Sequence, residues 1–419
     1  MKKGIIVILC VTLLLTACAN APTYHAQGAS DVHSLKNGSA ALPHNDESDV
    51  AEVPPETASI QFWGQTLGTV GTGCGTEDGY YYLQESGGNF ANLMYIDYES
   101  RKYLPLCARP ECTHEDETCT AYLPLCGSYP QLTANGNHLI LVYANVADSY
   151  YDTHKEAALA HLTVMDTDGA RKRVLTTLAA NESLQAGIAC DAAFVYVIKT
   201  AVTDTASTTA LCAISLADGT LKEIYPLPTG THFIVGAADR NVVVKSFSAP
   251  KGDTLYPQDA TQMFACIDVD TQKCIGQTTL PFGTGGAIPQ VLIDGTTQYV
   301  FEPDNRKITV QNLATGAQLY EQNEVVSQKI KWGQLVRVLH HKLVLSEVYE
   351  GAENAEDFWI DVTNGTRGTL TLKVSYDSLA HSAFPVVPAC TVGDSLLAVY
   401  QCKSQRAIHS DKTGHYLEG

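Results

Sequence analysis

Charged residues are scarce in this sequence, and basic ones are the scarcer kind. They occupy 17% of the 419 positions, and 45 acidic against 27 basic side chains give a formal net charge of −18. A diffuse acidic surface disfavours nucleic acid as a partner, since that contact depends on basic side chains. Cationic ligands are favoured slightly, but a soluble exported protein that repels its own copies is the simpler explanation. We therefore expect no nucleic-acid partner.

The common short catalytic motifs are also missing. The sequence has no Gly-x-Ser-x-Gly elbow, no phosphate-binding Walker loop and no His-Glu-x-x-His pair. The segment from Ser410 to Gly414 approaches the aspartate box of sialidase-like proteins, but its spacing is wrong and the aromatic residue is absent. We therefore expect a protein without catalytic activity. A hydrolase or lyase is the less favoured alternative. It stays open because dispersed catalytic carboxylates leave no local motif.

Long apolar runs are absent after the first residues. Lys2 and Lys3 precede the apolar run Gly4–Leu15, and the sequence Leu15-Thr16-Ala17-Cys18 follows. The run is too short for a comfortable membrane span, and its layout is that of an export signal. An ordinary secretory signal and a short transmembrane helix are the alternatives. Leu-Thr-Ala-Cys resembles the lipobox of bacterial lipoproteins. That resemblance implies a signal peptide over residues 1–17, lipidation of Cys18, and a lipid-anchored position on the extracytoplasmic side of the cell membrane.

Residues 18–59 are rich in Ala, Ser, Asn, Pro, Asp and Glu and have few large apolar side chains. Such a segment cannot bury enough surface to offset the entropy lost on ordering. We predict a flexible tether, which at about 40 residues has a root-mean-square reach of about 35 Å.

From residue 60 onward the chain repeats a short strand, a tight turn and a very apolar strand. Taking residues 78, 135, 191, 239, 294, 340 and 393 as markers, the repeats are 46 to 57 residues apart. A less apolar hairpin lies between successive copies, with turns such as Asp168-Gly169 and Thr315-Gly316. Asp-Gly and Asn-Gly pairs are strong hairpin signals.

Four-stranded units at this period predict an all-β fold, a β-propeller of four-stranded blades. We predict seven blades, with six or eight as alternatives, and one propeller domain over residues 60–419. Two β-sandwiches are the other option, although they would not give such even spacing. Residues 59–64 are predicted to form an extra strand that closes the ring by pairing with the last blade.

The turns inside each predicted hairpin are tight, whereas the loops on the other face are long. Binding residues usually lie on long loops carried by a rigid scaffold. The long loops are predicted at residues 107–130, 145–157, 200–209, 249–261 and 350–357. The candidate binding residues on them are Tyr150, Tyr151, Asp152, Tyr256, Asp259 and Asp357. Tyrosines with carboxylates suit sugars, peptides or cations, although solvated loop side chains with no ligand have the same composition.

Eleven of the thirteen cysteines follow Cys18, so complete pairing within one chain is impossible. The densest group is Cys107, Cys112, His114 and Cys119. Three thiolates and an imidazole within about 13 residues are enough for a closed tetrahedral zinc site, which would be structural. Disulfides such as Cys112–Cys119 suit an exported protein equally well, and free thiols are a third option.

This segment also carries a resemblance. It runs Leu106-Cys107, then Pro110-Glu111-Cys112-Thr113-His114, then Cys119-Thr120-Ala121-Tyr122. The pattern resembles a segment of uncharacterised β-propeller-containing lipoproteins from Gram-positive anaerobes. The resemblance implies fold and location, and it implies no activity. From these observations we expect an extracytoplasmic lipoprotein with a binding or scaffold role, either for a glycan or small molecule or for a protein partner in the cell envelope.

Overall fold

The computed structural model describes part of the chain in detail. The described residues are 59–63, 73–76, 78–85, 90–100, 102–125, 130–144, 159–248, 260–282, 288–326, 330–339, 341–349, 356–369, 387–392, 395–399, 408–410 and 416–418. The chain divides into two compact units, residues 1–41 and 42–419, and every described residue belongs to the second. The export signal and Cys18 lie outside the described residues, as does the tether up to residue 58.

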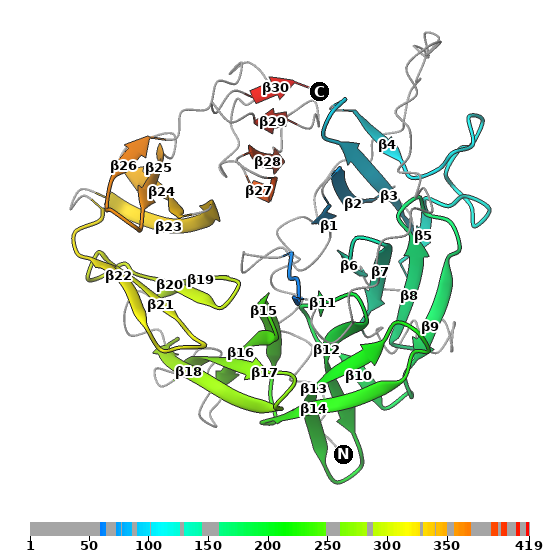
Figure 1. Cartoon of the computed structure of the whole chain (residues 1–419), viewed down its shortest axis with the longest axis horizontal. Coiled ribbons are helices and arrows are strands. Elements are labelled where there is room, and N and C mark those ends of the chain that lie inside the picture. The colour runs from blue at the N-terminus through cyan, green and yellow to red at the C-terminus, as the bar shows by residue number, and fades with distance from the viewer. Residues whose placement is uncertain are drawn as a thin grey trace. The chain divides into compact units, whose positions relative to one another are not determined.

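Within these ranges the chain forms strands and no helix, which confirms the predicted all-β class. No helix there has the length and apolar character needed to cross a membrane. The strands form antiparallel sheets, numbered here 1 to 7 in chain order, in which most neighbours along the chain are neighbours in the sheet (Figure 1). The predicted organisation into four-stranded units is therefore correct.

The strands of the first three sheets are these. Sheet 1 has β1 (Gly73–Gly75), β2 (Gly79–Glu85), β3 (Phe90–Asp97), β4 (Tyr103–Pro105) and β5 (Tyr122–Pro124). Sheet 2 has β6 (Gln131–Ala134), β7 (His138–Tyr143), β8 (His161–Asp166) and β9 (Arg173–Thr177). Sheet 3 has β10 (Glu182–Leu184), β11 (Ala189–Cys190), β12 (Phe194–Val202), β13 (Ser207–Ser215) and β14 (Leu221–Leu227).

The remaining four sheets follow the same order. Sheet 4 has β15 (His232–Ala238), β16 (Asn241–Ser248), β17 (Thr261–Asp268) and β18 (Lys273–Pro281). Sheet 5 has β19 (Gln290–Asp294), β20 (Thr297–Glu302), β21 (Lys307–Asn312) and β22 (Gln318–Gln322). Sheet 6 has β23 (Ile330–Leu339), β24 (Lys342–Tyr349), β25 (Glu356–Asp361) and β26 (Arg367–Thr369). Sheet 7 has β27 (Val387–Val392), β28 (Ser395–Val399), β29 (Ile408–Ser410) and β30 (Tyr416–Glu418).

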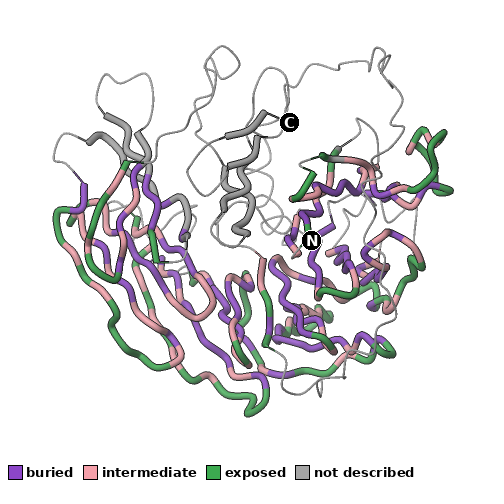
Figure 2. Tube along the Cα trace, turned by 45° about the horizontal axis from the view of Figure 1, so that its top comes forward, coloured by how far each residue is buried: buried purple, intermediate pink, exposed green. Residues whose placement is uncertain are grey.

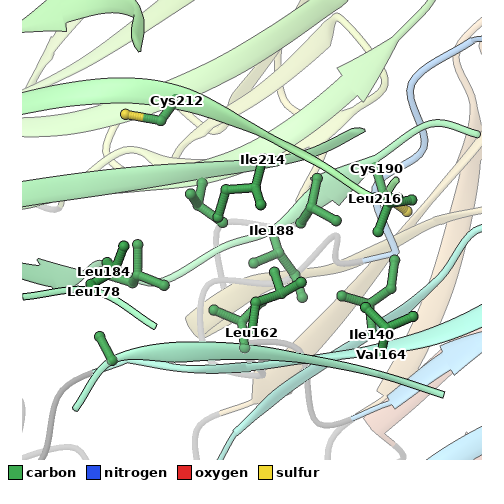
Figure 3. Packing of buried hydrophobic residues seen from close by; sticks show 14 of the residues in the cluster. Ile140, Leu162, Val164, Leu178, Leu184, Ile188, Cys190, Cys212, Ile214 and Leu216 are labelled. Atoms are coloured by element: carbon green, nitrogen blue, oxygen red, sulfur yellow. The ribbon is translucent and has the colours of Figure 1, made fainter. Parts of the chain in front are cut away.

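The second strand of sheet 2 is apolar from Leu139 onward because both of its faces are covered. In β7, Leu139 and Leu141 pack into a cluster with sheet 1, whereas Ile140 and Val142 pack against sheet 3. Side chains alternate between the two faces of a strand, so a continuous apolar run lets one strand serve two interfaces. Figure 3 shows the second of these interfaces, where Ile140 and Val164 lie opposite residues of sheet 3.

The fourth strands of sheets 2, 4 and 5 are exposed edges. Along β18 exposed and half-buried residues alternate, and β9 and β22 are mostly exposed (Figure 2). First strands instead contact the first strand of the next sheet, except that in sheet 3 these contacts are made by β11, which pairs with β12 as β10 does. These contacts join β1 to β6, β6 to β11, β11 to β15, β15 to β19, β19 to β23, β23 to β27, and β27 to β1.

Glutamine side chains join three of these neighbouring pairs in the same way. Gln131 in sheet 2 accepts a hydrogen bond from the backbone N–H of Gly187, at 2.6 Å. Gln185 in sheet 3 accepts one from the N–H of His232, also at 2.6 Å. Gln290 in sheet 5 accepts one from the N–H of Leu335, again at 2.6 Å. Each bond satisfies a backbone N–H on or beside a strand of the next sheet, namely β11, β15 and β23.

The prediction for residues 59–64 is wrong in its partner. Gln61 forms an isolated bridge with Cys190 in sheet 3, and Ile60 donates its N–H to the carbonyl of Asp239 in sheet 4 at 2.7 Å. Trp63 donates its Nε1–H to the carbonyl of Ala134 in sheet 2 at 3.1 Å. The segment thus lies against sheets 2 to 4. Ile60 is 2% exposed, and burial among the residues of sheets 3 and 4 explains this position.

Candidate metal centre

The cysteine–histidine segment interrupts the fourth strand of sheet 1. Both β4 and β5 pair with β3, β4 opposite Met94–Ile96 and β5 opposite Phe90–Asn92. Between them, Leu93 accepts a hydrogen bond from the N–H of Leu106 and donates its own N–H to the carbonyl of Ala121, both at 2.8 Å. Residues 106–121 therefore leave and rejoin the strand at a single partner residue. We call residues 106–121 the cysteine loop.

Local turns fold the cysteine loop back on itself. The N–H of Cys112 donates to the carbonyl of Arg109 at 3.3 Å, and Pro110 occupies the second position of this turn, which its fixed φ favours. A second turn links the N–H of Cys119 to the carbonyl of Asp116 at 3.0 Å. Thr120 closes the base by donating its hydroxyl to the carbonyl of Leu106 at 2.6 Å.

The structure brings all four predicted ligands together. One ligand atom from each of Cys107, Cys112, His114 and Cys119 lies within 4.8 Å of the others. In a tetrahedral site with zinc–sulfur bonds of about 2.3 Å, neighbouring ligand atoms are about 3.8 Å apart. The existing separation needs only small side-chain rotations to reach that geometry. Such a cluster can bind a metal ion.

His114 has a backbone conformation that supports this grouping. Its φ is +61°, in the left-handed region that a non-glycine residue adopts at a cost of about 1 kcal/mol or more. This conformation goes with a position in which Nδ1 lies 3.2 Å from the sulfur of Cys119. Among the four candidate ligands, only His114 has a positive φ.

The thiols differ in burial and in proton affinity. Cys119 is buried at 2% exposure, and burial raises the pKa of its thiol. Burial also raises the pKa of Cys107, but the backbone N–H and guanidinium of Arg109, together with the thiols of Cys112 and Cys119, outweigh it and lower that pKa to about 6. A thiolate is the form that binds metal. All three thiols are free in this structure.

Sheet 2 supplies the other wall of the centre. Lys172, which precedes β9, donates its ammonium to the carbonyl of Tyr122 at 2.8 Å and lies close enough to Cys119 for a favourable charge interaction. Gly169 packs against Leu106, and a Cβ on Gly169 would come within 3.2 Å of its side chain and carbonyl. The cysteine loop therefore connects sheets 1 and 2.

The other candidate residues fall elsewhere. Tyr150, Tyr151, Asp152, Tyr256 and Asp259 lie outside the described residues. Asp357 lies in β25, paired with Ser346, and not in the loop predicted for residues 350–357. The apolar residues that follow Asp357 belong to the same strand, and β25 begins at Glu356.

The sequence pattern did not single out two residues of the centre. Arg109 hydrogen-bonds to the sulfur of Cys112 at 3.1 Å, and Lys172 lies beside Cys119 from the next sheet. An arginine between two ligand cysteines could have been noticed. Nothing in the sequence connects residue 172 with residue 119, because only the packing of two sheets brings them together.

Comparison with family models and with curated proteins returns no match. Among solved structures, a prolyl endopeptidase is 11% identical with a TM-score of 0.43, and the match covers 75% of this chain and 42% of that one. An oligogalacturonate lyase in complex with manganese is 11% identical with a TM-score of 0.42, covering 82% and 87% of the two chains. The protein lmo1340 from Listeria monocytogenes is 12% identical with a TM-score of 0.46, covering 85% and 94%. This chain spans less than half the length of the peptidases it matches.

These comparisons contradict two expectations drawn from the sequence. We expected a binding or scaffold protein without catalytic activity, whereas the matching structures include peptidases, a lyase and a hydrolase. The expectation was wrong because it relied on missing motifs, and residues that act together from distant strands leave none. At 10–13% identity and with TM-scores below 0.5, the matches assign no reaction to this chain.

Proposed function

We propose that the protein holds a structural zinc ion in the cysteine loop. The observation that carries the proposal is the convergence of Cys107, Cys112, His114 and Cys119 within 4.8 Å. Three sulfur donors and one imidazole form the soft, closed ligand set that zinc takes in structural sites. With four protein ligands no position is left for water, so the ion's role is to stabilise the loop and the contact between sheets 1 and 2.

Purified protein, prepared with a thiol reductant and dialysed, should contain close to one zinc per chain by elemental analysis. Cys112→Ser should lose this zinc, whereas Cys274→Ser, which removes a half-buried thiol from β18, should retain it. At free zinc about 1,000-fold above the dissociation constant, binding should add about 4 kcal/mol to the stability of the loaded protein. Absence of zinc from the wild type after incubation with zinc would refute the proposal.

We propose further that the seven sheets are the blades of a seven-bladed β-propeller. The support is the closed series of first-strand contacts, in which β1 contacts both β6 and β27. In such a ring each blade buries its faces against its neighbours, so removing one blade should destabilise the others. A chain ending at residue 369 should therefore unfold at clearly lower urea than the longer chain. An unchanged midpoint would argue for sheets that do not close a ring.

Export and anchoring are proposed from the sequence. The support is the run from Lys2 to Leu15 followed by Leu-Thr-Ala-Cys, which fits cleavage before Cys18 and lipidation of its thiol. In bacterial cells, a Cys18→Ser variant should leave the membrane fraction and lose incorporation of labelled fatty acid. A variant that stays membrane-bound with an unchanged lipid label would show that Cys18 is not the anchor.

A further inference from the structure

We propose that Arg109 is a positioning residue of the zinc site, which holds the ligand thiolates by charge-assisted hydrogen bonds and covers them on the solvent side. The proposal rests on the proposed zinc binding. It adds to that binding a second layer of residues that sets how tightly the ion is held.

The guanidinium group contacts the ligands directly. Its Nη2 lies 3.1 Å from the sulfur of Cys112, and the guanidinium lies close enough to Cys107 and Cys119 to interact with their sulfurs electrostatically. The backbone N–H of Arg109 also favours the thiolate of Cys107 and lowers the pKa of that thiol. One residue thus supplies a hydrogen bond to one ligand sulfur and positive charge beside the other two. Ligand orientation by such outer groups is a general feature of metal sites.

A second hydrogen bond also holds the guanidinium of Arg109 in place. Nη2 also donates to the hydroxyl of Thr118 at 3.2 Å. That hydroxyl donates in turn to the carboxylate of Asp116 at 2.5 Å, and the N–H of Thr118 donates to the same oxygen at 2.9 Å. Although Arg109 is on the surface, its planar head is fixed between the thiols and an anchored hydroxyl.

Charge gives a reason for a cation at this position. Three thiolates and a neutral imidazole around a divalent ion leave a net charge of about −1. Arg109 neutralises that charge from within the cysteine loop. Lys172 provides a second cation on the Cys119 side, but its ammonium hydrogen-bonds to the carbonyl of Tyr122. Arginine suits the position because its fork presents several donors at once, whereas lysine is a point charge.

The test compares Arg109→Gln and Arg109→Lys in the zinc-loaded mature chain. The control is Arg171→Gln, because Arg171 is an exposed arginine that pairs with Asp166 and not with a sulfur. Zinc affinity is measured by competition with a chromogenic chelator. Each variant is also loaded with cobalt, and the sulfur-to-cobalt charge-transfer band is recorded.

We expect Arg109→Gln to bind zinc about 10- to 100-fold more weakly than the wild type, in line with other outer-layer substitutions. Its charge-transfer band should move to lower energy, because a sulfur without a hydrogen-bond donor gives up electrons more readily. Arg109→Lys should fall between the two, and Arg171→Gln should match the wild type. The cobalt band separates this role from a structural one, since a loss of loop stability alone would not move it.

Two results would overturn the inference in distinguishable ways. If the wild type binds zinc and Arg109→Gln matches it in affinity and in the cobalt band, Arg109 has no positioning role although the zinc site stands. If the wild type binds no zinc, the zinc site fails and this inference fails with it. Should Arg109→Gln not fold, Arg109→Lys decides, and a band and affinity equal to the wild type's would show that hydrogen-bonding geometry does not matter.

Discussion

Replacing Asp191 with asparagine should destabilise the contact between sheets 3 and 4 strongly. The Asp191 side chain is fully buried in the turn between β11 and β12, and it pairs with Arg240 in the turn between β15 and β16 at 2.7 Å. The same carboxylate oxygen accepts the hydroxyl of Tyr196 at 2.8 Å. Its other oxygen accepts the N–H groups of Ala193 and Phe194 at 2.9 and 2.7 Å.

The magnitude follows from what the substitution leaves behind. Asparagine keeps the shape and can still accept the two turn N–H groups, but it loses the charge that faces Arg240. Removing one partner of a buried ion pair costs about 3–5 kcal/mol. Arg240 is 20% exposed and keeps a second carboxylate, Asp270, so we expect about 3 kcal/mol.

Asp270 provides the matched control. It pairs with the same guanidinium at 3.0 Å, but its side chain is 52% exposed. An exposed pair contributes at most about 1 kcal/mol. Equilibrium urea unfolding of both variants, with the wild type alongside, measures the difference. If Asp270→Asn lost as much stability as Asp191→Asn, burial would not be what gives the Asp191 pair its weight, and the reasoning would be wrong.

Three further substitutions test other interactions between the sheets. Burial lowers the pKa of Lys245 to about 8, so between pH 8 and about 10.5 the folded chain binds fewer protons than the unfolded one, and stability should rise with pH by up to about 3 kcal/mol. In urea titrations, Lys245→Met should be more stable than the wild type at pH 7 and should lose this rise. If the pH dependence of stability were the same in the variant, Lys245 would not be its source. Gln185→Leu leaves the N–H of His232 without its acceptor and should lower the free energy of unfolding by about 1–3 kcal/mol. Gln318→Leu, at an exposed position, should lower it little. Equal losses would mean that the glutamine contact is not stabilising. Gly187 and Gly136 both have φ of +90°, but a Cβ would lie 2.1 Å from the carbonyl oxygen of Ile234 only at Gly187. Thermal unfolding of Gly187→Ala and Gly136→Ala should therefore show the larger loss of stability for Gly187→Ala. Equal losses would show that backbone conformation alone determines the cost.

Turn chemistry and apolar runs made the strands predictable. Asn135-Gly136 and Asp168-Gly169 mark turns at the positions where the structure has them, with positive φ at both glycines. The second strand of each unit could be recognised because a strand covered on both faces has no polar alternation. These signals are local, so a single sequence contains them.

Contacts between distant residues were predicted poorly. The sequence predicts a long loop over residues 200–209, yet β12 and β13 stay paired as far as Val202 and Ser207. The Thr residues in this segment do not alternate regularly with apolar residues, so the sequence shows no clear strand pattern there. The cysteine spacing predicted four ligands but could not predict Lys172, which meets them only because sheet 2 packs beside sheet 1.

The position of the cysteine loop also has a physical explanation. A fourth strand has a neighbour on one side only, so interrupting it removes few ladder bonds and leaves both faces of the sheet intact. Here the interruption leaves Leu93 with both of its backbone groups bonded, one to each end of the loop. The same insertion in β1 would break the contacts with β6 and β27. The sixteen residues of the cysteine loop must still be ordered. The two hydrogen bonds to Leu93 restrain the base of the loop. The proposed zinc ion would join three thiols and an imidazole at the centre of the loop, and its binding would add stabilisation to that of the loop's own hydrogen bonds.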